Sequence, residues 1–356
     1  MLNLELLRNP DGTYPEDIAK ILSTQDPEKK RILTSIGTKV IQYAQYFDAW
    51  DWLEDVLNEA GTRMEATAGL LYGPSGVGKT TVLRQFVGHY GGPFDTPDGI
   101  KRPVVRVSTP ANPTLPNMFK AMVIALGAEE ASSDNVSDLK SVLFRQIRQQ
   151  DVKLMIFDEF THVVEDRSQH FATKAVRGLK ELLGENICQC VFAGTEQLES
   201  LHEIYKQFRR RSGGDFAMLP FDWADADDQI EWVKIMDGLQ QQLPLKCVTP
   251  LGSSAMAKTM HIVSGGILDH VMKLLFRATS YAYDDEAGTI SDAHLSSAYE
   301  VLRRGDKKRS NPFGPSSRRV RSLSFNNDVA APPVEFPGDD LTNLRSSTRQ
   351  EADFSK

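Results

Sequence analysis

The chain has 356 residues, of which 40% are hydrophobic and 25% are charged, and 48 acidic against 41 basic residues give it a net charge of −7. This composition is ordinary for a globular protein with a sizeable core. No run approaches the roughly 20 apolar residues that span a bilayer, and a net negative charge does not favour indiscriminate nucleic-acid binding.

The cysteines indicate a reducing compartment, which we expect to be the cytoplasm. There are three, Cys188, Cys190 and Cys247, an odd and sparse set that argues against a disulfide framework. Cys188 and Cys190 lie within an apolar run without a histidine or further cysteine at zinc-site spacing, so we expect them to pack in the core. The N-terminus has early acids and a Pro/Gly break, and it does not read as a signal peptide.

The first two thirds of the chain predict an α/β sandwich. Residues 1–35 are polar and look like an arm, and an aromatic-rich helical segment covers 36–60. Four apolar runs predict strands that alternate with helices, which implies parallel pairing through crossovers. The predicted strands cover 69–73, 103–109, 153–158 and 188–194, and the helices cover 79–90, 116–127, 136–150 and 168–184.

After Pro220 the pattern becomes all helical. Helices are expected over 225–243, 251–264, 267–283 and 291–303, with Asp225, Ser254 and Ser291 as N-caps. Beyond Gly305 the chain is rich in Pro, Ser, Arg and Asn and cannot build a core. The predicted organisation is therefore an arm (1–35), an α/β domain (36–222), an all-α domain (223–304) and a mostly disordered tail (305–356).

The strongest motif is a phosphate-binding loop. The sequence "GPSGVGKTT" places Gly73, Gly78, Lys79 and Thr80 in the pattern GxxxxGK[ST], after an apolar strand and before a helix. Glycines let backbone N–H groups face the phosphates, the lysine neutralises them and the threonine hydroxyl ligates Mg²⁺. The predicted nucleotide-binding residues are Gly73, Pro74, Ser75, Gly76, Val77, Gly78, Lys79, Thr80 and Thr81.

Two acids end the third predicted strand, "KLMIFDEF". At that edge Asp158 is expected to hold Mg²⁺ together with Thr80, and Glu159 to act as general base toward the attacking water. Thr195 ends the fourth strand, where it can touch the γ-phosphate or the water; an ordinary strand-ending turn is the alternative. ATP and Mg²⁺ are thus the predicted cofactors, and ATP hydrolysis the predicted reaction.

The sequence contains three adjacent arginines, Arg209, Arg210 and Arg211. Because like charges repel one another, we expect this cluster to bind an anionic group. They lie near the end of the α/β domain, where an arginine can reach the γ-phosphate of a neighbouring subunit and stabilise developing charge. The alternative is an exposed basic helix end that complements the helix dipole.

These segments together resemble the AAA+ ATPases, and among them the TniB/TnsC transposition-regulator family. The likeness covers about residues 36–304 and rests on "GPSGVGKTT", "MIFDEF", "VVRVSTPANPTLPNMFKAMVIALGA", "VFAGTEQLESL" and "QFRRR". It implies an α/β fold of the AAA+ P-loop type, a three-layer sandwich with a parallel sheet, followed by a small all-α lid. Where such lids often carry a sensor arginine, this chain has Leu268 and Asp269, so that role is unassigned.

The resemblance also implies function. It implies an ATP-gated homo-oligomer, a ring or filament on double-stranded DNA, that links a target-selection protein to a transposase and disassembles on hydrolysis. Asp158, Glu159 and Thr195 take the metal, base and sensor roles, and Arg209–Arg211 include the finger that acts across the interface. DNA contacts are expected after the second strand, from Asn112, Thr114 and Lys120, although the turn itself carries no basic residue.

Two other functions remain open. One is a replication initiator or helicase loader, although only a short polar tail follows Gly305 instead of a further domain. The other is a signalling nucleotide switch that binds no DNA. The stretch 303–321, with eight basic residues and one acid, either binds DNA phosphates or an acidic partner, or solubilises a disordered tail.

Overall fold

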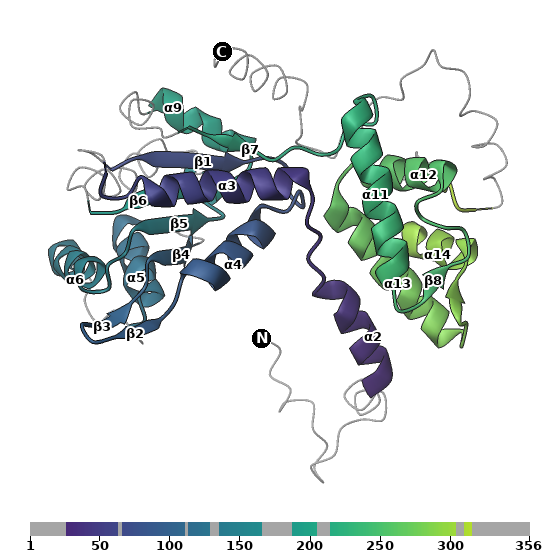
Figure 1. Cartoon of the computed structure of the whole chain (residues 1–356), viewed down its shortest axis with the longest axis horizontal. Coiled ribbons are helices and arrows are strands. Elements are labelled where there is room, and N and C mark those ends of the chain that lie inside the picture. The colour runs from purple at the N-terminus through teal and green to yellow at the C-terminus, as the bar shows by residue number, and fades with distance from the viewer. Residues whose placement is uncertain are drawn as a thin grey trace, which may run out of the picture. The chain divides into compact units, whose positions relative to one another are not determined.

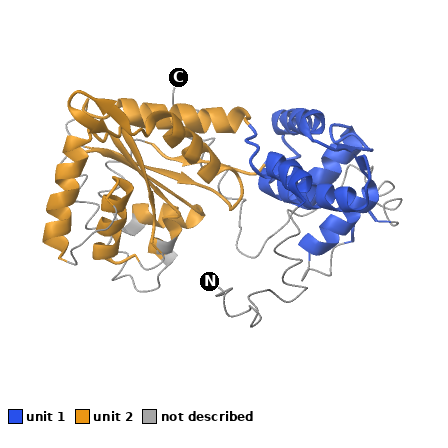
Figure 2. Cartoon of the chain, turned by 90° about the horizontal axis from the view of Figure 1, so that it is seen from below, with its two compact units in different colours: residues 1–41, 221–333 blue, residues 42–220, 334–356 orange. Residues whose placement is uncertain are grey.

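The computed structural model describes residues 26–62, 66–110, 113–128, 135–165, 187–204, 214–303 and 310–314. These residues divide into two compact units, with boundaries after Ile41 and after Pro220 (Figure 2). One unit combines residues 26–41 with the helical segment that follows Pro220, and the other is the α/β unit. Each is described by itself.

The α/β unit is built on a five-stranded parallel sheet with the order β4-β5-β6-β1-β7 (Figure 1). Its strands are β1 (Ala68–Tyr72), β4 (Val104–Ser108), β5 (Leu154–Asp158), β6 (Gln189–Gly194) and β7 (Phe216–Ala217). A hairpin of β2 (Phe94–Thr96) and β3 (Gly99–Lys101) precedes β4. The predicted parallel sheet is confirmed, and β6 separates the two strands that carry the phosphate loop and the acids.

Helices cover the sheet on both faces. They are α3 (Ala44–Asn58), α4 (Lys79–Tyr90), α5 (Leu115–Ala125), α6 (Val136–Gln149), α7 (Thr161–Glu165), the 3₁₀ helix η2 (Glu196–Glu199) and α9 (Ser200–Ile204). Buried side chains of α5 and α6, among them Met118, Phe119 and Leu143, form one core with Met155 and Phe157 of β5. Because side chains alternate along a strand, Leu154, Ile156 and Asp158 point to the other face.

The helical unit consists of α2 (Pro27–Gly37), α11 (Ala226–Gln242), α12 (Ser254–Ser264), α13 (Leu268–Asp284) and α14 (Asp292–Leu302), with the short strands β8 (Lys246–Cys247) and β9 (Thr289–Ile290). Helix α2 packs against α13, and Lys29 pairs with Asp284 at 2.6 Å. The predicted caps Asp225 and Ser291 are confirmed, because each side chain accepts first-turn N–H groups. The predicted cap Ser254 is wrong: Ser253 precedes α12, without a side-chain capping bond.

Three further segments differ from the expectation. The helical stretch 36–60 is broken between α2 and α3, where Val40 and Ile41 are β-branched and favour extended backbone. Residues 27–35 are helical rather than an irregular arm. Phe313, which composition assigns to the tail, is buried and stacks edge-on against Tyr299 of α14. The predicted helix 168–184 and the basic stretch beyond Gly314 lie outside the described residues.

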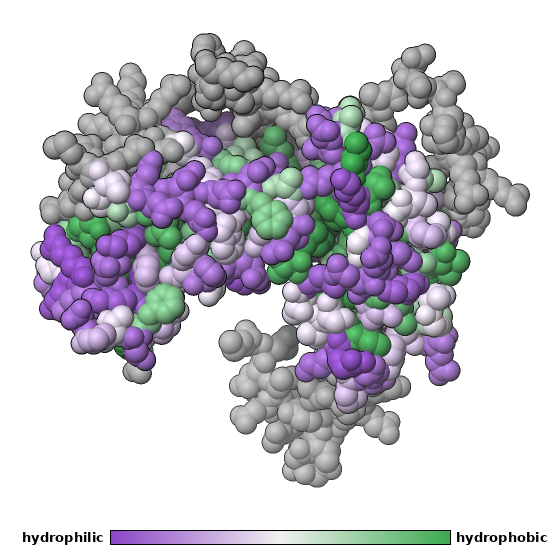
Figure 3. All heavy atoms as spheres, viewed as in Figure 1, coloured by the Kyte–Doolittle hydropathy of each residue, from purple (hydrophilic) through white to green (hydrophobic). Residues whose placement is uncertain are grey.

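The surface of the described residues is mixed. On the face in Figure 3, hydrophilic residues cover most of each unit, and hydrophobic ones show between them in smaller groups. Among the described helices, none is both long and apolar enough to cross a membrane. Cys188 and Cys190 are free and buried, which confirms the expected core packing, and Cys247 is also free and buried.

Candidate nucleotide site

The phosphate-loop segment connects β1 to α4 at the carboxyl end of the sheet. Gly73 has φ +146°, and a Cβ atom there would lie 1.9 Å from the carbonyl oxygen of Met218. Gly78 has φ +111°, a left-handed conformation that side chains disfavour. These two positions explain why the loop needs glycine. Gly78 also offers no side chain to cap α4, which leaves first-turn N–H groups for an anion.

The other loop residues have distinct places. Pro74 and Val77 are buried, whereas Ser75 is exposed and Gly76 lies between these extremes. The carbonyl oxygen of Val77 accepts a hydrogen bond from the Tyr43 hydroxyl at 2.6 Å, which fixes the loop to the start of α3.

The first turn of α4 brings three predicted residues together. Lys79 Nζ donates to the carbonyl oxygens of Gly73 (2.6 Å) and Pro74 (2.7 Å), so its charge lies at the loop. Thr80 and Thr81 follow on the same turn and are both half-buried. A cation held here has the position that the chemistry of phosphate binding requires.

Thr80, on the first turn of α4, is in contact with Asp158 at the end of β5. The Thr80 hydroxyl donates to Asp158 Oδ1 at 3.4 Å, and the backbone N–H of Glu159 donates to the same oxygen at 2.9 Å. Asp158 is only 3% exposed. A hydroxyl and a carboxylate are oxygen ligands of the kind that Mg²⁺ takes beside nucleotide phosphates, so the donor set fits this ion.

Arg106 is the residue of this site that sequence reasoning missed. From β4, its Nε and Nη2 both donate to Asp158 Oδ2, at 3.1 and 2.7 Å. The available signal was a single arginine in the middle of the buried run "VVRVS". A charged residue in such a position needs a partner.

Glu159 and Thr195 lie at the ends of neighbouring strands. Glu159 is exposed and has φ +57°, a strained backbone for a residue other than glycine and of a kind that gathers at functional sites. Thr195 follows β6, and its N–H donates to the Thr161 hydroxyl at 2.7 Å. Register pairs Tyr72 with Gly194, so Gly73 and Thr195 are the next residues on adjacent parallel strands.

The hydroxyl of Thr195 is buried and has no hydrogen-bond partner among the described residues. An unpaired buried hydroxyl next to the start of the phosphate loop fits a ligand that brings its own acceptor, as a phosphate does.

The other predicted residues fall into two groups. Arg209, Arg210, Arg211 and Asn112 lie outside the described residues. Thr114 caps α5, where its hydroxyl oxygen accepts from the N–H of Asn117 at 3.4 Å. Lys120 is half-buried on the same helix.

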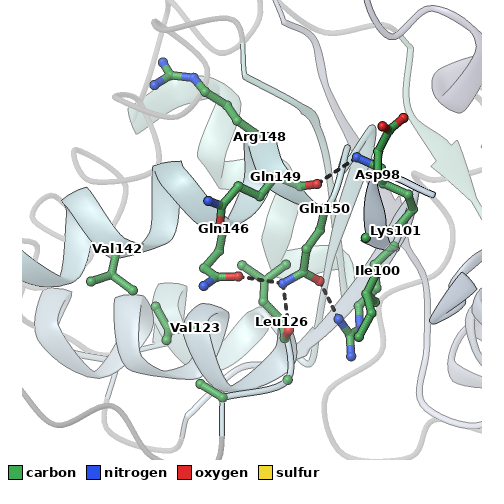
Figure 4. Close-up of a pocket in the computed structure, with 14 residues that line it drawn as sticks. Asp98, Ile100, Lys101, Val123, Leu126, Val142, Gln146, Arg148, Gln149 and Gln150 are labelled. Atoms are coloured by element: carbon green, nitrogen blue, oxygen red, sulfur yellow. Dashed lines mark hydrogen bonds between the residues drawn. The ribbon is translucent and has the colours of Figure 1, made fainter. Parts of the chain in front are cut away.

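A cavity of about 680 Å³ lies elsewhere (Figure 4). It is lined by the β2–β3 hairpin and the C-terminal ends of α5 and α6, near the amino ends of β4 and β5. In parallel strands this is the edge opposite to the phosphate loop. Its polar groups serve the fold, because Lys101 donates to the Gln149 carbonyl and Gln150 donates to that of Leu126. This cavity is therefore not the nucleotide site.

Comparison with solved structures agrees with this architecture. The chain is similar to Cdc6p from Pyrobaculum aerophilum, with 12% identity, a TM-score of 0.53, and coverage of 76% of this chain and 70% of that chain. It is also similar to the ORC1 protein of Aeropyrum pernix in complex with DNA, with 16% identity, a TM-score of 0.52, and coverage of 83% and 73%.

The parallel sheet, the phosphate loop and the acidic strand end define the fold of the AAA+ P-loop NTPases, and the chain also contains a separate helical unit. The model of the family described as "Bacterial TniB protein" matches residues 31–213. The chain belongs to the TniB family. No curated protein matched the chain significantly.

Proposed function

We propose that this chain is an ATP-dependent regulator of DNA transposition. It assembles on double-stranded DNA as a ring or filament of identical subunits, connects a target-selection protein to the transposase, and disassembles when ATP is hydrolysed. Membership of the TniB family supports the biological role, and the Thr80–Asp158 contact beside the phosphate loop is the observation that supports ATP gating.

We assign the residue roles as follows, with the contacts of the site as support. Mg²⁺-ATP supplies an activated γ-phosphoryl group when it is bound. Lys79 and the N–H groups of the loop bind the phosphates, Thr80 and Asp158 Oδ1 hold the metal, and the Thr195 hydroxyl donates toward the γ-phosphate or the attacking water. Glu159 accepts the proton of that water, since it is exposed at the same edge as Asp158.

Two features of the proposal depend on neighbouring molecules. Arg209–Arg211 supply the arginine that reaches the γ-phosphate of the next subunit, so that ATP at the interface stabilises the oligomer. Asn112, Thr114 and Lys120 contact DNA phosphates and grip the duplex without reading its sequence. The free, buried cysteines favour action in the reducing cytoplasm.

Imaging of the purified protein tests the proposal. We expect ordered rings or filaments around duplex DNA with a non-hydrolysable ATP analogue, and dispersal when ATP replaces it. A protein that stays monomeric at saturating nucleotide, with or without duplex, contradicts the proposal and favours a nucleotide switch. Assembly only in the presence of a helicase favours the loader alternative.

A further inference from the structure

The carboxylate of Asp158 forms hydrogen bonds to side chains of two different elements, β4 and α4. Its Oδ2 accepts both donors from Arg106 of β4, whereas its Oδ1 accepts from Thr80 and from the N–H of Glu159. The guanidinium does not bridge the two carboxylate oxygens. It occupies one oxygen and leaves the other toward the first turn of α4.

Strand register explains how Arg106 reaches this position. Arg106 pairs with Ile156 in the β4–β5 ladder, and Asp158 lies two residues further along β5 on the same face. The two side chains are thus diagonal neighbours, which is within the reach of a long arginine side chain. The Arg106 side chain is 28% exposed, against 4% for that of Asp158, so the carboxylate is the buried member of the pair.

A buried carboxylate without a partner is costly, so the arginine has a clear electrostatic role. A carboxylate with a free torsion could turn either oxygen toward a metal. Fixing Oδ2 with two N–H donors removes that freedom and directs Oδ1 toward Thr80. This is how residues behind the ligands of a metal site orient them.

We propose that Arg106 is a positioning residue for the metal half of the nucleotide site. It holds Asp158 by Oδ2 so that Oδ1 and the Thr80 hydroxyl face the same Mg²⁺. This inference rests on the proposed nucleotide site, and it adds a residue of β4 that the phosphate-loop motif and the acid pair do not contain.

The test measures the Mg²⁺ dependence of nucleotide binding instead of turnover. A fluorescent, non-hydrolysable ATP analogue is titrated against Arg106→Gln and the parent protein, in EDTA and over a range of Mg²⁺ concentrations. We expect Arg106→Gln to raise the half-effective Mg²⁺ concentration by about 10- to 100-fold. Affinity for the analogue in EDTA should stay within about twofold of the parent, because Lys79 and the loop are untouched.

Two variants accompany the test. Arg106→Lys keeps the charge but loses the paired donors of the guanidinium, and we expect a smaller shift in the same direction. It carries the test by itself if Arg106→Gln does not fold, as judged by circular dichroism and thermal unfolding. Arg148→Gln removes an arginine at the other edge of the sheet, on the rim of the cavity, and should leave the Mg²⁺ dependence unchanged.

Two outcomes overturn the inference. An unchanged Mg²⁺ dependence in folded Arg106 variants means that the arginine only compensates charge, and a lowered half-effective concentration means that it competes with the metal. Failure of the proposed function looks different. If analogue binding by the parent protein does not depend on Mg²⁺, the proposed metal site is absent. If that binding depends on Mg²⁺ but the protein does not assemble on DNA, the transposition role is contradicted and the inference about Arg106 still stands.

Discussion

The two units use buried polar groups in different ways. In the α/β unit, polar side chains gather at one edge of the sheet: Thr80 and Asp158 are in contact, and the Thr195 hydroxyl is without a partner among the described residues. In the helical unit, several polar groups complete the packing. Trp232 Nε1 donates to the Ala257 carbonyl at 2.9 Å.

His261 and Ser291 illustrate the same point. His261 Nε2 donates to the Phe221 carbonyl at 2.7 Å, and Ser291 forms a reciprocal capping box with His294. The contrast teaches that polar substitutions at the phosphate-loop edge of the α/β unit should change nucleotide chemistry, while buried polar substitutions in the helical unit should change stability. Four predictions test this division, from the largest expected effect to the smallest.

The largest effect is expected from Lys79→Ala. It removes the cation that lies against the Gly73 and Pro74 carbonyls, and ATP affinity and turnover should each fall by about 100-fold or more, the loss typical of a preorganised charge-stabilising donor. Fluorescent-nucleotide titration and phosphate release measure the two quantities. Lys273→Ala, which breaks an exposed pair with Asp269 in the helical unit, is the matched control and should leave both unchanged. Equal losses of ATP affinity and turnover in Lys79→Ala and Lys273→Ala would contradict the difference between the two units.

Glu159→Gln should separate binding from turnover. Without a general base, we expect turnover to fall by about 100-fold or more while the affinity for ATP stays near that of the parent. Any DNA assembly should then persist in ATP, because hydrolysis no longer ends it. The control is Glu199→Gln, an exposed acid that follows the neighbouring strand. Normal turnover in Glu159→Gln refutes the base assignment.

Trp232→Phe should act on stability alone. Trp232 is fully buried, and the change leaves a gap and removes the hydrogen bond to the Ala257 carbonyl, at a cost of about 1–3 kcal/mol in the free energy of unfolding. Denaturant unfolding measures this cost. Trp223→Phe, at a half-buried position nearby, should cost less than about 0.5 kcal/mol. A loss of nucleotide affinity in the folded Trp232 variant contradicts the division between the units.

The smallest effect concerns pH. Burial lowers the pKa of His261 below its usual 6.5, and the Phe221 carbonyl and nearby aspartates oppose this only in part. The unfolded chain therefore binds the proton more readily, and His261 should contribute stability that is complete above pH 6.5 and is lost as the pH falls through 6.5 toward the folded pKa. Thermal unfolding at pH 7.5 and 5.5 measures the difference, and His261→Gln should reduce it. An identical pH dependence in the variant contradicts this assignment.

Local motifs and long buried runs could be predicted from the sequence. The helix after the phosphate loop begins and ends where expected, at Lys79 and Tyr90, because glycine and the first-turn residues define its start. The four longest strands of the sheet lie within two residues of their expected bounds, since a mostly buried strand reads as a nearly continuous apolar run. Strand β7 was missed because two residues form no pattern.

Interactions between distant segments could not be predicted. The pair Arg106–Asp158 depends on the register of β4 against β5, and register follows from the whole sheet rather than from either strand. The β2–β3 hairpin had a local signal, Pro97-Asp98-Gly99, but its strands are too short for visible alternation. The packing of α2 on α13 likewise joins segments that lie more than 200 residues apart in the sequence.

The interior place of β1 in the sheet has a consequence for the thermodynamics of ligand binding. Its neighbours pair with it on both sides, and Met218 N–H donates to the Tyr72 carbonyl just before the loop begins. The backbone at the start of the phosphate loop is therefore ordered before any ligand binds. Little conformational entropy remains to be lost there on binding, and backbone amides of β1 should be among the slowest in the α/β unit to exchange with deuterium.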